Sequence, residues 1–338
     1  MESRKEKILD AIIASYIATP HPVGSRTISK EYDLGVSSAT IRNEMSDLED
    51  LGYLSKPHSS AGRIPSERAY RFYVDRYLAS REEESLPSPS FFQEKGLGID
   101  ALLAKTLRYL AEQTEYLAFV TSPRIRDTSL RSVELFPLDE YTVLCLLIGN
   151  QGVVEKTLLR LRKPIRAEEV AQIRLALNRE LTGINFSEVE SLSLHIEGPM
   201  RRFEGLITRI VEMAVAMGRK VSQREIHAEG WSNLLAASQV QDFEEVRNLL
   251  SFCEQRNNLL RLVPELDEVQ TLSVVIGSEH PLEAMAHSSI ITATYSGREG
   301  PLGQVGLIGP MRMDYIPMMR LLEGLSHGLS QRLGATMN

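Results

Sequence analysis

The sequence predicts a multidomain α+β protein that begins with a winged helix-turn-helix. Three observations favour this fold. The 338 residues are enough for two or three domains. Near the N-terminus, three amphipathic segments have helix-turn-helix spacing, and a hairpin rich in Gly and Ser follows them. Further along, strand-like segments form two groups with helical segments between them, which is typical of an α+β domain with another α+β unit inserted in it.

The first helix is expected over residues 6–18, whose isoleucines give it a broad apolar face. A Pro- and Gly-rich stretch at residues 20–24 ends it. A short second helix is expected over residues 26–32, followed by a tight turn at 33–36. A third helix should begin after Ser37 and Ser38, which can act as N-caps, and stop before Gly52.

The third helix has the residue pattern of a DNA recognition helix. Ile41, Met45, Leu48 and Leu51 recur at helical spacing and predict a face packed on the core. The opposite side of its first turns carries Ala39, Thr40, Arg42 and Asn43, and its acidic residues come late. Small and hydrogen-bonding side chains at the leading end suit a DNA major groove. An ordinary amphipathic helix is the alternative, because such helices also have a polar face.

The hairpin after this helix supports the DNA interpretation. Tyr53-Leu54 and Arg63-Ile64 are expected to pair across a small, polar tip at residues 59–62. Lys56, His58 and Arg63 bury nothing apolar there, so phosphate is their natural partner. A fourth helix is expected over residues 67–78.

Nine residues are therefore predicted to bind double-stranded DNA. We expect Arg42 to reach guanine and Asn43 to reach adenine. Serine and threonine hydroxyls at the helix start should hold phosphate, and the three wing cations should anchor the hairpin. The nine residues are Ser37, Ser38, Ala39, Thr40, Arg42, Asn43, Lys56, His58 and Arg63.

The charge distribution agrees with a local DNA-binding surface. The whole chain has a formal net charge of −7, which would disfavour nucleic acid if it were uniform. Residues 1–81 hold 12 Lys+Arg and 11 Asp+Glu, a net charge of +1, so the remainder carries −8. Residues 54–81 alone hold six cations against Glu67 and Asp75. Local charge is what meets phosphate.

The rest of the chain alternates between helical and strand-like patterns. An acidic run and alternating Ser and Pro predict a linker over residues 82–98, with an ordered strap as the alternative. Helices are expected over 99–114, 165–182, 200–220, 242–262 and 315–333. Strands are expected over 117–121, 132–137, 142–148, 153–161, 225–228, 272–276, 289–295 and 304–308, the second to fourth as an antiparallel meander.

No catalytic or cofactor-binding constellation emerges from the sequence. A nucleotide loop at residues 303–309 is disfavoured, because its glycines lack the required order and suit a strand better. Glu279, His280, Glu283 and His287 could bind a metal, but helix-start chemistry after Pro281 is the better interpretation. Cys145 and Cys253 predict free thiols in a reducing cytoplasm. No segment has the length of a membrane span or of a signal peptide.

Seven motifs in this sequence closely resemble the HrcA family of bacterial heat-inducible transcription repressors. They occur in family order along nearly the whole chain. They lie at residues 37–45, 51–54, 57–65, 70–75, 229–235, 292–295 and 309–315. Three positions depart from the family pattern: Met311 replaces a small polar residue, and Ser59 and Ser66 replace threonines.

The resemblance implies a cytoplasmic, non-enzymatic repressor of chaperone operons. It implies a homodimer on an inverted-repeat operator, with activity modulated by temperature and by the chaperonin GroEL. It also implies a DNA-binding domain at 1–81, a GAF-like domain at 99–130 and 221–338, and a dimerisation domain inserted at 131–220. A regulator that senses a small ligand through the GAF-like domain is the alternative. Residues 309–315 could be a structural corner, or a subunit or domain contact that holds the protein in one state.

Overall fold

The computed structural model divides the chain into two compact units. The first unit is Met1–Ser122, Ile226–Ser296 and Gly303–Ser330, and the second is Pro123–Glu225, Gly297–Leu302 and Gln331–Asn338. The residues that the structure describes are 3–57, 61–80, 89–94, 96–123, 129–150, 153–185, 198–222, 225–233, 247, 249, 251–252, 256–266, 271–298 and 300–336.

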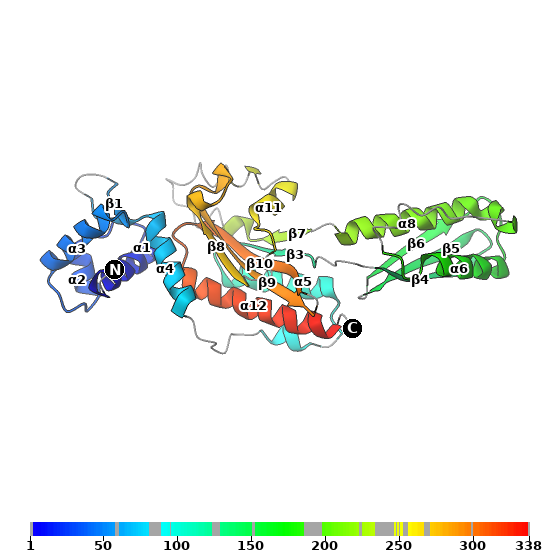
Figure 1. The fold of residues 1–338 in the computed structure, drawn as a ribbon, viewed down its shortest axis with the longest axis horizontal. Helices are drawn as coiled ribbons and strands as arrows, with labels where there is room; N and C mark the ends of the chain where they lie inside the picture. Colours follow the sequence, from blue (N-terminus) through cyan, green and yellow to red (C-terminus); the bar gives the residue numbers. More distant parts are fainter. Residues whose placement is uncertain are drawn as a thin grey trace. The chain divides into compact units, whose positions relative to one another are not determined.

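Three helices open the first unit, and a two-stranded hairpin and a fourth helix follow them (Figure 1). The helices are α1 (Ser3–Ala18), α2 (Ser25–Glu31), α3 (Ser38–Asp50) and α4 (Glu67–Ser80), and β1 (Leu54–Ser55) pairs antiparallel with β2 (Ile64–Pro65). Their apolar faces meet in a small core made by Ile8, Leu9, Ile12, Ile13, Ile28, Ile41, Met45, Leu48 and Val74. The predicted order of these elements is confirmed.

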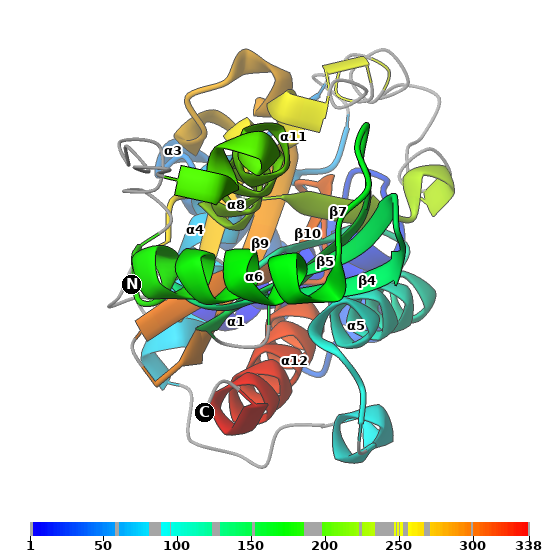
Figure 2. The same cartoon turned by 90° about the vertical axis from the view of Figure 1, so that its right-hand side faces the viewer.

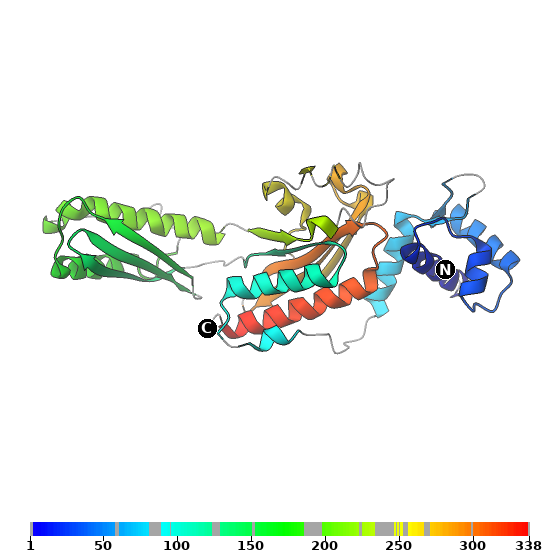
Figure 3. The same ribbon diagram turned by 180° about the vertical axis from the view of Figure 1, so that it is seen from behind.

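The first unit also contains a five-stranded sheet. Its strands, in spatial order, are β7 (Ile226–Glu229), β3 (Leu117–Thr121), β10 (Gly300–Pro310), β9 (Ser288–Gly297) and β8 (Leu272–Ile276). Helices α5 (Ile99–Gln113) and α12 (Tyr315–Thr336) lie along one face, and α11 (Arg256–Leu262) lies on the other (Figures 1 and 3). The 3-10 turns η4 (Gly277–Glu279) and η5 (Glu283–Met285) follow β8.

In the sequence, the main segment of the second unit, Pro123–Glu225, lies between β3 and β7, which are paired neighbours in that sheet. The chain leaves the sheet after β3 and returns to it at β7. Between them, β4 (Leu130–Asp139), β5 (Thr142–Gly149) and β6 (Val154–Arg160) form a three-stranded antiparallel meander, as predicted. Helices α6 (Ala167–Leu181) and α8 (Glu204–Ser222), preceded by the 3-10 turn η3 (Gly198–Phe203), run beside these strands (Figure 2).

One face of the three-stranded sheet packs on both helices. Alternate strand residues point into this core: Val133, Leu135, Val143, Cys145, Leu147 and Leu159. The helices meet them with Val170, Ile173, Leu177, Leu206, Ile207, Ile210 and Ala214. The apolar residues at every second strand position and at helical spacing on α6 and α8 therefore form one core between a sheet layer and a helix layer.

Three local expectations need correction or completion. Leu51 does not complete the core stripe of α3, because the helix ends at Asp50 and leaves Leu51 46% exposed. Pro281 does not start a helix, because η5 begins at Glu283. Within the predicted linker, Ser90–Gln93 forms the 3-10 turn η1, whose buried Phe92 fits against Gly328 of α12. The expected helix over residues 242–262 falls partly outside the described residues.

Among the described residues, no helix is long and apolar enough to cross a membrane.

Candidate nucleic-acid interface

The start of α3 is held by side-chain capping. Ser37 is the N-cap, and its Oγ accepts a hydrogen bond from the backbone N–H of Thr40 at 3.2 Å. The two hydroxyl oxygens of Ser37 and Thr40 lie 3.0 Å apart and share a hydrogen bond. This cap satisfies one of the free N–H groups of the first turn and fixes where the helix begins. Both hydroxyls therefore have a structural role at the predicted DNA-binding end.

One face of α3 stands free in solvent while the other is buried. Ile41 and Leu48 are fully buried, whereas Ala39, Arg42 and Asn43 are exposed. Ser38 and Thr40 are partly buried at the edge of this face. No described residue forms an ion pair with Arg42, so its guanidinium is available to a ligand. We call Ala39, Arg42 and Asn43 the exposed face of α3.

The acidic side chains of α3 are paired away from this face. Lys5 Nζ lies 2.9 Å from a carboxylate oxygen of Asp47 and 3.7 Å from one of Glu44. Arg4 also reaches Glu44, at 3.7 Å. Cations from α1 thus offset two carboxylates that would otherwise repel phosphate. These pairs are partly exposed, so their effect is mainly on the local potential rather than on stability.

A third carboxylate, Glu49, ties the base of the hairpin to the end of α3. Its Oε2 lies 3.1 Å from Lys56 Nζ and 2.7 Å from Arg63 Nη2. Burial opposes the charge of Glu49, but the hydrogen bond from Lys56 and the charge of Arg63 outweigh it and lower the pKa of this carboxyl. The Arg63 side chain is only 15% exposed, whereas that of Lys56 is 39% exposed. Of the two wing cations, Lys56 is the more accessible.

Backbone contacts hold the other side of the hairpin. Val23 and Arg63 exchange two N–H···O hydrogen bonds of 2.8 Å each, which join the hairpin to the segment between α1 and α2. Gly62 makes this approach possible, because a Cβ there would lie 2.6 Å from the carbonyl carbon of Val23 and 2.7 Å from that of Pro22. The residue before Arg63 therefore has to be glycine if the bridge is to form.

The beginning of α4 closes the end of α3, a set of contacts that the sequence reasoning missed. Ser66 Oγ donates to the carbonyl of Gly52 at 2.7 Å, and Arg68 Nη1 donates to the carbonyl of Leu51 at 2.7 Å. The Arg68 guanidinium also lies 4.7 Å from the ring centroid of Tyr53. These donors satisfy carbonyls that a helix end leaves free. Only the proximity of α4 in the fold reveals them.

The nine predicted residues thus fall into three groups. Ala39, Arg42, Asn43 and Lys56 are exposed, while Ser37, Ser38, Thr40 and Arg63 lie at the helix start or the hairpin base with partly structural contacts. His58 lies outside the described residues. The contact of Glu49 with the hairpin was not predicted, because nothing in the sequence distinguishes Glu49 from the neighbouring carboxylates of α3.

Glu279 and His280 of the disfavoured metal site make structural contacts, and the disfavoured nucleotide loop lies in a strand. Glu279 accepts hydrogen bonds from Arg71, and His280 Nε2 lies 3.1 Å from the carbonyl of Leu262 while its Nδ1 accepts from Leu282 N–H. Within the part of the chain that the structure describes, no three His, Cys, Asp or Glu residues are grouped to hold a metal ion. Residues 303–309 lie in β10 rather than in a nucleotide loop.

Comparison with known proteins identifies relatives along nearly the whole chain. Residues 100–319 match the family profile described as HrcA protein C terminal domain. The chain is 35% identical over 329 residues to the heat-inducible transcription repressor HrcA of Lachnoclostridium phytofermentans, covering 96% of this chain and 95% of that protein. It is 36% identical over 339 residues to the repressor of the same name from Brevibacillus brevis, covering 98% of each.

A solved structure shares the fold. The crystal structure of a hypothetical protein at 2.2 Å resolution superposes with a TM-score of 0.71 at 27% sequence identity, covering 99% of each chain. Both the profile match and the full-length identity to named repressors are sufficient to place this sequence. The chain belongs to the HrcA family of heat-inducible transcription repressors.

Proposed function

We propose that this repressor binds an inverted-repeat operator as a homodimer, with each winged helix-turn-helix placing α3 in a major groove. The observation that carries the proposal is the exposed face of α3. Its free guanidinium and amide side chains suit base edges, and the neighbouring carboxylates are already paired with lysine and arginine. The operators of chaperone genes are the expected targets, because the relatives are named for heat induction.

Roles within this interface follow from exposure. Arg42 and Asn43 would contact base edges, and Lys56 would contact phosphate from the hairpin. Ser38 and Thr40 lie at the helix start, where N–H groups and hydroxyls favour a phosphate oxygen. Arg63 would act mainly by fixing the hairpin, since its side chain is largely buried against Glu49.

The second unit supports the homodimer. Strand β5 is apolar on both faces, which is typical of a strand covered on both sides. Described helices pack on only one of these faces, as the shared core shows. On the other face, Phe136 pairs with Leu144 and Leu144 pairs with Leu158 across the three strands.

We call this second face the open sheet face. Its apolar residues are Phe136, Leu144, Leu146, Ile148, Val154 and Leu158, and Glu134 and Lys156 flank Leu146 on the same face. Phe136, Val154 and Leu158 are 46%, 54% and 59% exposed. Exposed apolar residues with charged neighbours of this kind are typical of an interaction site. A second copy of the chain is a fitting occupant, because two such faces are self-complementary around a twofold axis.

The remaining parts of the proposal come from the family. The five-stranded sheet with its flanking helices would be a GAF-like domain, and the second unit would be the dimerisation domain inserted in it. GroEL and temperature would modulate repression in the cytoplasm. Operator affinity measured across the growth-temperature range, with and without GroEL, tests this layer, and a flat response in both arms contradicts it.

A gel-shift titration of the purified full-length chain tests DNA binding and dimerisation together. The probe is an inverted-repeat fragment, the competitor is random duplex, and light scattering gives the mass of the complex. We expect two subunits per fragment and a preference for the inverted repeat of at least about 1,000-fold. A single subunit in solution and on DNA, or equal binding of both duplexes, contradicts the proposal.

A further inference from the structure

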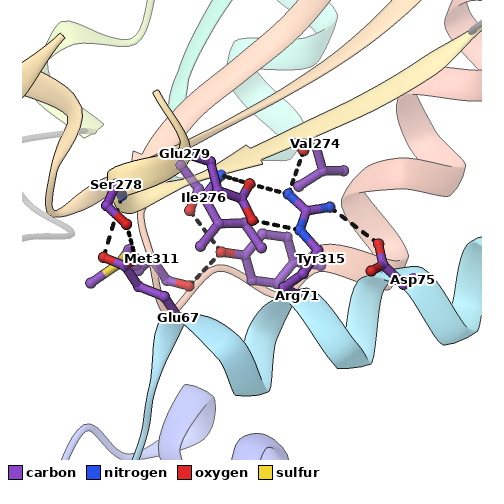
Figure 4. Close-up of polar contacts among 10 residues, drawn as sticks. Glu67, Arg71, Asp75, Val274, Ile276, Ser278, Glu279, Met311 and Tyr315 are labelled. Atoms are coloured by element: carbon purple, nitrogen blue, oxygen red, sulfur yellow. Dashed lines mark hydrogen bonds and ion pairs between the residues drawn. The ribbon is translucent and has the colours of Figure 1, made fainter. Parts of the chain in front are cut away.

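Helix α4 contacts both the N-terminal helices and the five-stranded sheet of the first unit. Toward the N-terminal helices, Arg76 Nη2 donates to Asp10 of α1 at 2.5 Å. Toward the five-stranded sheet, Glu67 and Arg71 reach residues at the end of β8 and in η4 (Figure 4). The helix is therefore the physical connection between the three DNA-binding helices and the sheet.

The Arg71 side chain makes a fork-shaped contact with the turn after β8. Its Nε donates to Glu279 Oε1 at 2.7 Å, and its Nη2 donates to Glu279 Oε2 and, at 2.7 Å, to the carbonyl of Val274. Glu279 also accepts the backbone N–H of Ile276 at 2.8 Å, which fixes the carboxylate (Figure 4). Two-point pairing of this kind defines orientation as well as distance, because both planar groups must be aligned.

Arg71 also contacts a second carboxylate. Its Nη1 lies 3.3 Å from Asp75 Oδ1 on the same helix. Burial opposes the charge of the guanidinium, but the hydrogen bond and charge of Glu279 outweigh it and raise the pKa of Arg71. The Arg71 guanidinium therefore keeps its positive charge at neutral pH.

A second contact lies one turn earlier on α4. Glu67 accepts the backbone N–H of Ser278 at 3.3 Å and also the Ser278 hydroxyl (Figure 4). Gly277 has φ +49°, and a Cβ there would overlap the Glu67 carboxylate and lie 2.9 Å from Met311 Sδ. The turn is thus shaped to receive the glutamate. We call the pairs Arg71–Glu279 and Glu67–Ser278 the α4 clamp.

An aromatic contact lies beside the α4 clamp. The rings of Tyr70 and Tyr315 are 5.7 Å apart, and Tyr315 Oη donates to the carbonyl of Met311 at 2.6 Å. Met311 and Tyr315 belong to the 309–315 motif, whose alternatives from sequence were a structural corner or a domain contact. Its contact with α4 places the motif where the DNA-binding helices meet the sheet.

We propose that Arg71 and Glu67 are positioning residues, which fix the DNA-binding helices on the five-stranded sheet and so determine the half-site spacing that the repressor accepts. This inference rests on the proposed binding of an inverted repeat by a homodimer. A dimer gains from its second half-site only when both recognition helices meet the groove together. The two pairs of the α4 clamp hold the DNA-binding helices in one preferred orientation on the sheet. Without these pairs, the covalent connection alone allows a broader range of orientations.

The test compares variants of the full chain on a series of inverted repeats whose spacers differ by single base pairs, and on a single half-site. We expect the unaltered chain to prefer one spacing by about 10-fold or more. Arg71→Ala and Glu279→Ala should reduce that preference to about threefold, while single-half-site affinity changes by less than about twofold. Arg71→Glu with Glu279→Arg should restore part of the preference.

Lys105→Ala is the matched control. Lys105 of α5 forms an ion pair with Glu94, and its side chain is 43% exposed against 28% for Arg71. Neither residue of this pair belongs to α4, so the variant should keep the spacing preference. Arg71→Lys, which retains the charge but loses the fork, serves as the second variant if Arg71→Ala loses its helical circular dichroism.

Three outcomes would overturn the inference. Arg71 variants that keep the full spacing preference show that the clamp does not set it. Variants that lose single-half-site and operator affinity equally show a role inside the DNA-binding surface instead. An unaltered chain that binds no inverted repeat contradicts the proposed function itself, and is recognised before any variant is measured.

Discussion

At the scale of single residues, position in the fold decides what a charge does. Arg42 and Arg63 are both cationic and both lie in the predicted DNA-binding motif. Arg42 is exposed, whereas Arg63 is largely buried against Glu49. Helical periodicity was enough to predict the first, because Arg42 lies about 100° around the helix from Ile41 and therefore outside the buried stripe. The second depends on a contact between α3 and the hairpin, which no local pattern contains.

Arg42→Ala and Lys56→Ala should weaken DNA binding in different ways. Loss of Arg42 should cost about 1–3 kcal/mol on the operator and relax discrimination at particular base pairs. Loss of Lys56 should weaken all sequences alike and reduce the slope of log K against log salt by about 1. Gel shifts on single-base operator variants at several salt concentrations check both. Equal losses on operator and random DNA for both variants contradict the assignment.

Glu49→Gln should uncouple the hairpin and change its acid response. The lowered pKa of Glu49 means that its ion pairs stabilise the fold above the usual carboxyl pKa of 4.5 and are lost as pH falls through the lowered value. The variant should lose about 0.5–1 kcal/mol at pH 7 and almost nothing at the acid end. Denaturant titrations at both pH values measure this. A loss independent of pH would mean that packing, rather than charge, is involved.

Cys145 should resist alkylation until the second unit unfolds. Burial raises the pKa of its thiol to about 11, so almost no thiolate is present at pH 8. The thiol of the unfolded chain, with its usual pKa of 9.0, ionises before the buried thiol does. The folded state therefore loses stability relative to the unfolded state as pH rises from 9 toward 11. Iodoacetamide labelling of a Cys253→Ser chain, with and without denaturant, checks the expectation. Rapid labelling of the native chain would contradict the buried position.

At the scale of elements, the sequence predicted helices and strands better than it predicted which of them pack together. Hydrophobic periodicity located α1, α3 and the β4–β6 meander, because their side chains repeat at 3.6 or 2 residues. It could not predict that β3 lies between β7 and β10, because that order depends on contacts between distant segments. The connecting role of α4 was missed for the same reason. A helix pattern reveals a polar face, but not what the polar face touches.

Gly62→Ala should displace the hairpin from the α1–α2 segment. The added methyl would lie within 2.7 Å of two backbone carbonyl carbons, which cannot move aside as a side chain can. We expect a loss of about 1–3 kcal/mol in unfolding free energy and weaker DNA binding. Gly98→Ala is the control, since nothing lies within 4 Å of its Cβ position. Equal melting temperatures for the two variants would contradict the close approach.

At the scale of the whole molecule, the two units divide the proposed work. The first unit contains the exposed face of α3 and the α4 clamp, and the second contains the open sheet face. The sequence predicted an inserted unit from its two groups of strands. It did not indicate which surface would pair, because β5 has the same apolar pattern whether a helix or another chain covers its second face.

Leu158→Asp should convert the dimer into single subunits. A carboxylate on the open sheet face would have to be desolvated when two copies pair, which is unfavourable by several kcal/mol. Leu175→Asp is the control, because Leu175 is 65% exposed on α6 and lies away from that face. Sedimentation measures the mass of each variant, and operator affinity should fall only for Leu158→Asp. An unchanged mass contradicts the proposed seam.

If two copies pair through the open sheet face as proposed, this face links transcription to the concentration of the protein. A single subunit would then expose Phe136, Val154 and Leu158 to water until it pairs with a second copy. At low subunit concentration, the dimer concentration falls with the square of the subunit concentration, so a twofold decrease in subunits removes about three quarters of the dimer. A chaperone that binds or refolds the single subunit would therefore change repression more steeply than its own abundance changes.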